Sequence, residues 1–126
     1  ISFLSRLSAK QERDYFIENL SMLTESGMDV LASLQAIKED VRSSGMKMII
    51  DTMIIDIESG STLWRALERT KLAQDQVIAL VRVGEESGRL SENLSVVALQ
   101  QEKDRAFKSK IRSAMMYPVL VLIITS

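Results

Sequence analysis

The side chains of this sequence best suited to chemistry are carboxylates, and two of them are adjacent, at Glu85 and Glu86. Both precede a predicted helix end at Gly88, where the partly negative helix terminus disfavours acidic groups. Neighbouring residues of a helix point about 100° apart, so this pair does not form a catalytic dyad. Two interpretations of the pair stay open. Both carboxylates are solvated, or they are candidate partner-interface residues, in which case Glu85 pairs with a basic group, contacts a partner or binds a cation.

Other acidic residues offer oxygen ligands, but nothing around Asp51, Asp56 and Glu58 resembles a calcium loop. The chain has no Cys and no His, which excludes thiolate nucleophiles and histidine-based acid–base catalysis and removes the usual ligands of structural zinc. It also lacks a Walker loop and a dinucleotide fingerprint. We therefore predict a protein that is not an enzyme and that binds no cofactor. A carboxylate-based hydrolase, the enzymatic alternative, would need two buried carboxylates that face one cleft.

Trp64 and Gly84 stand out among the remaining residues. Trp64 packs in the core or, if it is exposed, anchors a partner interface. Gly84 lies inside a predicted helix, where Gly costs about 1 kcal/mol relative to Ala, and close packing of another helix would offset that cost. The seven Met residues are interpreted as filling gaps in the core, with an adaptable surface near Met28, Met46 and Met48 as the alternative.

Charge is distributed unevenly along the chain. Residues 1–101 carry 11 basic and 15 acidic groups, a net charge of −4, whereas residues 102–112 carry five basic and two acidic groups, a net charge of +3. This basic cluster precedes an uncharged run, as is typical of the cytoplasmic side of a membrane helix, where anionic headgroups attract it. A solvated helix face is the alternative. Nucleic-acid binding is not predicted, because Phe107 is the only aromatic residue among the basic ones. The cluster comprises Lys103, Arg105, Lys108, Lys110 and Arg112.

Residues 113–126 contain no charged side chain and are mostly apolar. About 20 such residues cross a bilayer, so we predict the start of a transmembrane helix here, with a kink or a break at Pro118. A buried C-terminal helix is the alternative, although the run lacks the polar face that such a helix shows to water. The chain is therefore divided into a lead-in segment at 1–8, a helical domain at 9–112 and a membrane segment at 113–126.

The domain is predicted to be all-α, because apolar residues recur with helical spacing throughout. Glu-Ser-Gly occurs three times, ending at Gly27, Gly60 and Gly88, and each Gly is expected to end a helix with a positive φ. Short turns of this kind join antiparallel neighbours. The expected architecture is a six-helix antiparallel bundle of stacked hairpins, whose last helix runs into the membrane segment.

Local signals predict the helix limits. Ser8-Ala-Lys-Gln11 reads as a capping box that begins the first helix. Asp29 caps the second helix, residues 43–45 break the helical pattern before the third helix, and Ser61 begins a short fourth helix. Residues 46–57 are rich in β-branched side chains, so a strand is the alternative to a helix there.

Several segments together resemble a known family. They are Val83-Gly-Glu-Glu-Ser-Gly-Arg-Leu90, Gly60-Ser-Thr-Leu-Trp-Arg-Ala-Leu67 and Ala114-Met-Met-Tyr-Pro118. In combination they resemble the cytoplasmic domain of the inner-membrane platform protein of type II secretion and type IV pilus machines, over about residues 9–124. The positions that carry the family motif are Gly27, Gly60, Leu63, Gly84, Glu85, Ser87, Gly88, Leu90, Tyr117 and Pro118.

The resemblance implies a helical domain on the cytoplasmic side of the bacterial inner membrane. It implies a scaffold that docks the assembly ATPase, other inner-membrane components and further copies of itself, as a homodimer or higher homo-oligomer. Such a scaffold couples the work of the ATPase to the assembly of pilin or pseudopilin subunits. The alternative from a different class is a soluble helical adaptor or signalling domain without a membrane role, in which residues 114–126 close the bundle.

Overall fold

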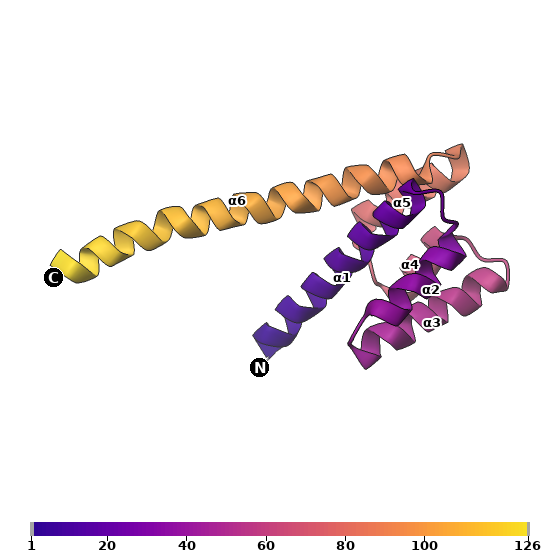
Figure 1. Ribbon diagram of the computed structural model, residues 1–126, viewed down its shortest axis with the longest axis horizontal. Helices are drawn as coiled ribbons and strands as arrows, with labels where there is room; N and C mark the ends of the chain where they lie inside the picture. Colours follow the sequence, from indigo (N-terminus) through magenta and orange to yellow (C-terminus); the bar gives the residue numbers. More distant parts are fainter. Residues whose placement is uncertain (1, 126) are drawn as a thin grey trace.

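The structure of the chain is a computed structural model, which describes the backbone of residues 2–125 and the side chains of residues 10–107. Over residues 2–125 every regular element is a helix, and the predicted all-α, six-helix fold is confirmed (Figure 1). The strand alternative for residues 46–57 is excluded, since they lie within the third helix. The helices are α1 (Ser2–Glu25), α2 (Val30–Asp40), α3 (Ser44–Glu58), α4 (Leu63–Thr70), α5 (Asp75–Ser87) and α6 (Leu90–Thr125).

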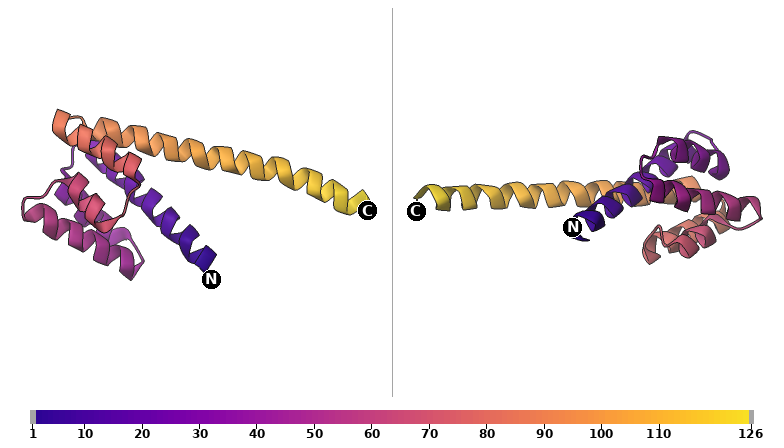
Figure 2. Two further views of the ribbon diagram at one scale, coloured as in Figure 1. Left: turned by 180° about the vertical axis from the view of Figure 1, so that it is seen from behind. Right: turned by 90° about the horizontal axis from the view of Figure 1, so that it is seen from below.

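The helices form a stack of hairpins that the two long helices close. Each helix packs against the next one in the chain, and α6 returns to pack along α1. The shorter helices α2 to α5 lie together at one end of the molecule, whereas the N-terminal part of α1 and the C-terminal part of α6 project from them and diverge (Figure 1 and Figure 2). Because α6 has 36 residues, it is a rod of roughly 54 Å.

The core consists of one apolar face from each helix. Buried side chains follow the spacing of three and four residues that the sequence shows, so each helix is held by its own stripe. Burying each of the larger ones stabilises the fold by about 1.5–3 kcal/mol. The buried apolar residues are Phe16, Ile17, Leu20, Leu34, Ile37, Met46, Ile50, Met53, Ile54, Leu63, Ala66, Leu67, Leu72, Val81, Leu94 and Val97.

Polar side chains begin the short helices. Asp29 accepts a hydrogen bond from the backbone N–H of Ala32 at 2.7 Å and caps α2, as predicted. Ser43 caps α3 and Thr62 caps α4 in the same way. The fourth helix therefore begins two residues after the predicted Ser61, because the hydroxyl that satisfies its first turn belongs to the next residue.

The three Glu-Ser-Gly copies end helices with the backbone conformation that the sequence predicts. The φ angle is 97° at Gly27, 102° at Gly60 and 74° at Gly88, a region that residues with a Cβ adopt only with strain. Gly45 behaves differently, because it lies in the first turn of α3. The interruption predicted at 43–45 falls instead at residues 41–43.

The predicted start of the first helix is wrong, and one of the two alternatives at Pro118 is excluded. α1 begins at Ser2 rather than at the capping box of Ser8, since the preceding residues contain neither Gly nor Pro and continue the helix. α6 runs to Thr125, so it does not break at Pro118. The alternative, a kink at Pro118, stays a prediction. The domain limits at 8/9 and 112/113 fall inside these helices and also stay predictions.

The expected membrane segment occupies the end of α6. Within the described part of the chain, no helix combines the length and the apolarity that crossing a bilayer requires. The side chains of residues 108–126 lie outside the described residues, and with them Tyr117, Pro118 and three members of the basic cluster, Lys108, Lys110 and Arg112. The start of a transmembrane helix at 113–126 is therefore still a prediction.

Candidate functional site

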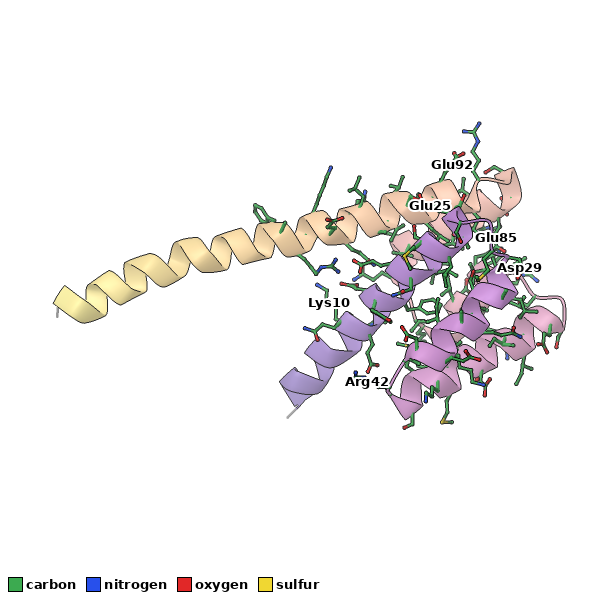
Figure 3. All side chains as sticks on the ribbon, in the orientation of Figure 1. Lys10, Glu25, Asp29, Arg42, Glu85 and Glu92 are labelled. Atoms are coloured by element: carbon green, nitrogen blue, oxygen red, sulfur yellow. The ribbon has the colours of Figure 1, made fainter. Side chains whose placement is uncertain are left out.

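The carboxylate of Glu85 closes the N-terminus of α4. Its Oε2 accepts a hydrogen bond from the backbone N–H of Leu63 at 2.9 Å, and its Oε1 accepts one from the N–H of Trp64 at 2.7 Å. An α-helix leaves its first N–H groups without internal partners, and the positive end of its dipole favours a negative charge there. Figure 3 shows Glu85 among the helices that surround it. Its contact is thus within the chain, with the backbone of α4 rather than with a basic side chain.

The neighbouring carboxylate has a different environment. Glu86 is exposed and forms an ion pair with Arg82, one turn earlier on α5, at 3.1 Å. Exposed pairs of this kind contribute well under about 1 kcal/mol. The two carboxylates therefore act separately. Among the residues that the structure describes, no three acidic side chains gather closely enough to hold a metal ion.

Gly84 allows α5 and α6 to approach each other closely. A Cβ built at Gly84 would lie 2.9 Å from Leu90 Cα and 3.2 Å from the carbonyl oxygen of Arg89. The turn between α5 and α6 is also held by a hydrogen bond from the backbone N–H of Arg89 to the carbonyl of Gly84 at 2.8 Å. Asn93 adds a second link, since its Nδ2 donates to the carbonyl of Leu80 at 2.8 Å. This close approach fixes the end of α5, and with it the position of Glu85.

Trp64 is half-buried and packs against the edge of the core. The guanidinium carbon of Arg82 lies 4.5 Å from the centroid of its ring, and that of Arg65 lies 5.2 Å away. Both are cation–π distances. Arg82 therefore contacts Trp64 on α4 as well as Glu86 on its own helix. Trp64 is neither a fully buried core residue nor an isolated exposed anchor.

The predicted motif residues meet where α4, α5 and α6 join. Leu63 and Trp64 begin α4, Gly84 and Glu85 lie near the end of α5, and Leu90 begins α6. We call these five residues the α4–α5–α6 junction. Gly60 and Gly88 form the turns beside it, Ser87 donates a hydrogen bond to the carbonyl of Val83 at 2.7 Å, and Gly27 belongs to the α1–α2 turn.

Only part of the predicted basic cluster lies among the described side chains. Lys103 is exposed, whereas the guanidinium of Arg105 lies 2.5 Å from Oε1 of Glu18 on α1. Further along the same two helices, Ser95 donates a hydrogen bond to Glu25. Arg105 therefore joins α6 to α1.

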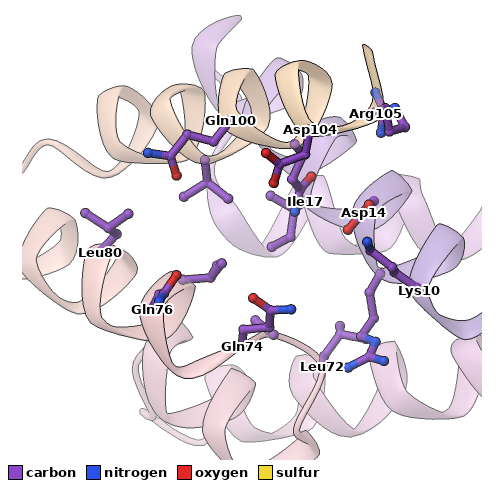
Figure 4. A pocket seen from close by; sticks show the side chains of 15 residues that line it. Lys10, Asp14, Ile17, Leu72, Gln74, Gln76, Leu80, Gln100, Asp104 and Arg105 are labelled. Atoms are coloured by element: carbon purple, nitrogen blue, oxygen red, sulfur yellow. The ribbon is translucent and has the colours of Figure 1, made fainter. Parts of the chain in front are cut away.

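A pocket of about 400 Å³ lies between α1, α6, α5 and the segment that leads into α5 (Figure 4). Its lining combines the basic Lys10, Arg13 and Arg105 with the acidic Asp14 and Asp104, over an apolar floor that includes Ile17. Charges of both signs therefore line the pocket, with one more basic side chain than acidic ones. The sequence patterns did not indicate this pocket, because its residues are far apart in the chain.

A second hollow, which we call the α1–α2 groove, has a volume of about 480 Å³. This groove was not predicted from the sequence either. A signal for it was present, because Glu39 and Asp40 lie at the C-terminal end of α2, where the helix dipole disfavours acidic residues. The groove is lined by Tyr15, Asn19, Met22, Leu23, Ala36, Ile37, Glu39 and Asp40.

One hydrogen bond spans the two walls of the α1–α2 groove. The hydroxyl of Tyr15 donates to Oδ2 of Asp40 at 2.5 Å. This bond, together with desolvation and the negative charge of Asp40, raises the pKa of Tyr15 above its ordinary value. The amide of Asn19 donates to the carbonyl of Tyr15 at 2.8 Å. Asp40, one of the two carboxylates on the rim of the groove, is therefore held by a hydrogen bond from the opposite wall.

Comparison with known proteins gives a consistent set of relatives. The family model for the type II secretion system (T2SS), protein F, matches residues 16–126. The type IV pilus assembly protein PilC of Pseudomonas aeruginosa is 32% identical over 110 residues, which cover 86% of this chain and 29% of the relative. PilC of Thermus thermophilus is 30% identical over 123 residues, or 98% of this chain and 30% of the relative.

A protein named for transport is also similar. The HofC homolog of Escherichia coli, a protein transport protein, is 27% identical over 107 residues, which are 84% of this chain and 27% of the relative. The chain thus spans less than a third of the length of the relatives that it matches. The matched region contains all of α2 to α6 and residues 16–25 of α1, so the chain belongs to the type II secretion system protein F family.

Proposed function

We propose that this chain is a non-enzymatic platform domain of a type II secretion or type IV pilus assembly machine. It docks the cytoplasmic assembly ATPase and other copies of itself, and it passes the work of the ATPase to pilin or pseudopilin subunits. The match of residues 16–126 to the protein F family carries the proposal. Relatives named for type IV pilus assembly and for protein transport support it.

The architecture suits a part that transmits force through contacts. The long helices α1 and α6 pack along each other and are joined by the Arg105–Glu18 ion pair and the Ser95–Glu25 hydrogen bond. Protein interiors are close-packed and resist compression. A displacement of the α2–α5 end would therefore move α6 as a rod rather than deform the bundle.

The described side chains support binding rather than catalysis. Glu85, the acidic residue that the sequence singled out, uses both oxygens to cap α4, and Glu86 is engaged in an exposed ion pair. Neither carboxylate is therefore available as part of a buried acid–base pair, which a carboxylate-based hydrolase needs.

In this proposal the domain lies on the cytoplasmic side of the inner membrane. The uncharged run at 113–126 enters the bilayer, and the basic cluster lies at the lipid headgroups. Of the two members whose side chains the structure describes, Lys103 and Arg105, it is Arg105 whose charge is used elsewhere, in its pair with Glu18. The lipid contact is accordingly assigned to Lys103 and to the three basic residues at 108–112.

Binding of the ATPase is the direct test. The purified chain is titrated with the assembly ATPase and its adaptor from the same organism, and ATP hydrolysis by the chain alone is measured in parallel. We expect saturable binding and no hydrolysis by the chain. Deletion of residues 9–110 from the parent protein should abolish export or pilus assembly in cells. Failure to bind either protein, together with normal assembly after the deletion, would contradict the proposal.

A further inference from the structure

The α1–α2 groove is an open hollow whose occupant no comparison names. We propose that it docks a basic amphipathic helix of a cytoplasmic partner protein. The inference rests on the proposed function for the existence of such a partner. It adds which surface of the chain the partner uses and what chemistry the docked segment must have.

The floor of the groove is apolar and adaptable. Met22 on α1 is 58% exposed although it lines the groove. The partly buried Leu23 and Ala36 contribute further apolar surface, and Ile37 lies buried at the base. Two neighbouring helices with such a floor offer the geometry in which a third, amphipathic helix lays its apolar face. The flexible thioether of Met adjusts to the shape of the incoming side chains.

The rim of the groove is acidic. Glu39 and Asp40 line it, and no basic side chain does. Lys38 is engaged with Asp51 on α3 at 2.5 Å. Arg42, which is exposed and as near to Asp40 in sequence, does not line the groove. The partly negative C-terminal end of α2 adds to the two carboxylates. An occupant that complements this rim carries Lys or Arg beside its apolar face.

The rim is also preorganised. Tyr15 donates to Asp40 and is itself contacted by Asn19, so one of the two carboxylates is already positioned before a partner arrives. A preorganised charge reduces the ordering that binding costs. The acidic pair at the end of α2 lowers the stability of that helix. Attraction to a basic partner would offset this cost when the partner binds.

Two other occupants fit these observations less well. In a two-fold contact with a second copy, the same patch faces itself, so the acidic rims of both copies would repel each other. Anionic lipid headgroups would be repelled for the same reason. The remaining occupant is a basic segment of a different protein.

The first experiment uses a defined probe, a 14-residue helical peptide built from Leu and Lys, with a Leu and Glu peptide as its counterpart. Its affinity for the purified chain is measured by fluorescence anisotropy. The double substitution Glu39→Gln and Asp40→Asn keeps the acceptor for Tyr15 and removes two charges. We expect it to weaken binding of the Lys peptide about tenfold, whereas Glu58→Gln with Glu68→Gln, two exposed carboxylates elsewhere, changes it less than about twofold.

The apolar floor has its own matched pair of variants. Met22→Ala should weaken binding of the Lys peptide about fivefold, and Met48→Ala, which removes an even more exposed methionine from α3, should leave it unchanged. Far-ultraviolet circular dichroism checks that all variants remain folded. Equal binding by wild type and all variants, or equal binding of the Glu peptide, overturns the inference.

The ATPase titration described above, repeated with the groove variants, separates this inference from the proposed function. Loss of both peptide and ATPase binding in the Glu39/Asp40 variant supports both. Loss of peptide binding with ATPase and adaptor binding intact overturns the groove as the docking surface and leaves the proposed function standing. If the wild-type chain binds neither machine protein, the proposed function fails, and selective peptide binding still supports the groove.

Discussion

At the scale of single residues, the contacts of Glu85 and Gly84 fix how α4, α5 and α6 meet at the α4–α5–α6 junction. Glu85 holds the start of α4 with two charge-assisted hydrogen bonds, and Gly84 leaves room for the backbone of α6. The two residues are adjacent, so the close approach of α6 and the cap on α4 depend on one short stretch of α5. Substitutions at either position should therefore act on the same three helices.

Replacing Glu85 tests the cap. Glu85→Ala removes both acceptors from N–H groups that are partly buried, so we expect a loss of about 2 kcal/mol in the free energy of unfolding. Glu85→Gln keeps one oxygen acceptor and should lose about half as much. Urea denaturation measures both. Glu86→Gln is the matched control and should change stability by less than about 0.5 kcal/mol; equal effects at the two positions would show that the cap adds nothing.

Adding a methyl group at Gly84 tests the close approach. Gly84→Ala gains helix propensity, but its Cβ would lie 2.9 Å from a backbone atom of Leu90, so we expect a net destabilisation of about 1–3 kcal/mol. Gly45→Ala is the control, because its nearest contact is an ordinary 3.6 Å to Ser43 Oγ. That variant should be neutral or up to about 1 kcal/mol more stable. A stabilised Gly84→Ala protein would refute the packing role.

At the scale of helices, the Tyr15–Asp40 bond between α1 and α2 makes a prediction about pH. The pKa of Tyr15 is raised in the folded chain, because its hydroxyl donates to a carboxylate. The protonated phenol therefore stabilises the fold below the ordinary tyrosine pKa of about 10, and this contribution is lost as the pH rises through the higher folded value.

The unfolding free energies of wild type and Tyr15→Phe, measured at pH 8 and pH 11, test this linkage. Wild type should lose more stability than the variant over that interval, because Phe does not ionise. Lysine and arginine titration is common to both proteins and cancels in the comparison. A parallel loss in the two proteins would mean that the Tyr15–Asp40 bond is not formed in solution.

Much of the helical order was predictable because its signals are local. Asp29 and the glycines at 27, 60 and 88 act on the few residues beside them, so the sequence pattern alone located the short helices. The start of α1 was missed because the capping box at Ser8 competes with a continuous helical stretch before it. The cap by Glu85 was not predictable, since its partners lie 21 and 22 residues earlier in the chain.

The binding surfaces were less predictable than the helices for the same reason. The α1–α2 groove combines Tyr15 and Met22 with acidic residues of another helix, and only the packing of α1 on α2 brings them together. Arg105 was assigned to a membrane-facing cluster because of its neighbours in sequence, whereas its contact is Glu18 on α1. Helical periodicity shows which face is apolar, but it does not identify the side chains across an interface.

At the scale of the whole molecule, the long helices α1 and α6 pack on each other, and the short helices are attached to them through α2 and α5 (Figure 2). Swapping the charges of Arg105 and Glu18 tests whether their ion pair joins the two helices. Arg105→Glu places like charges together and should cost about 1 kcal/mol, and adding Glu18→Arg should restore most of that loss. Thermal denaturation of the single and double variants measures the coupling. Additive losses in the double variant would show that the pair does not join the two helices.

The role as a docking platform is tested most directly in cells that assemble pili or secrete protein. The chain has no Cys, so Met22→Cys, Met48→Cys and Val83→Cys each introduce a single exposed thiol into this part of the parent protein. A bifunctional thiol-to-amine crosslinker is applied, and the products are identified by mass spectrometry. We expect adducts with the assembly ATPase, with the position at 22 joined to a basic amphipathic segment. Accessible thiols that yield no adduct with any machine component, in cells with normal assembly, would contradict the platform role.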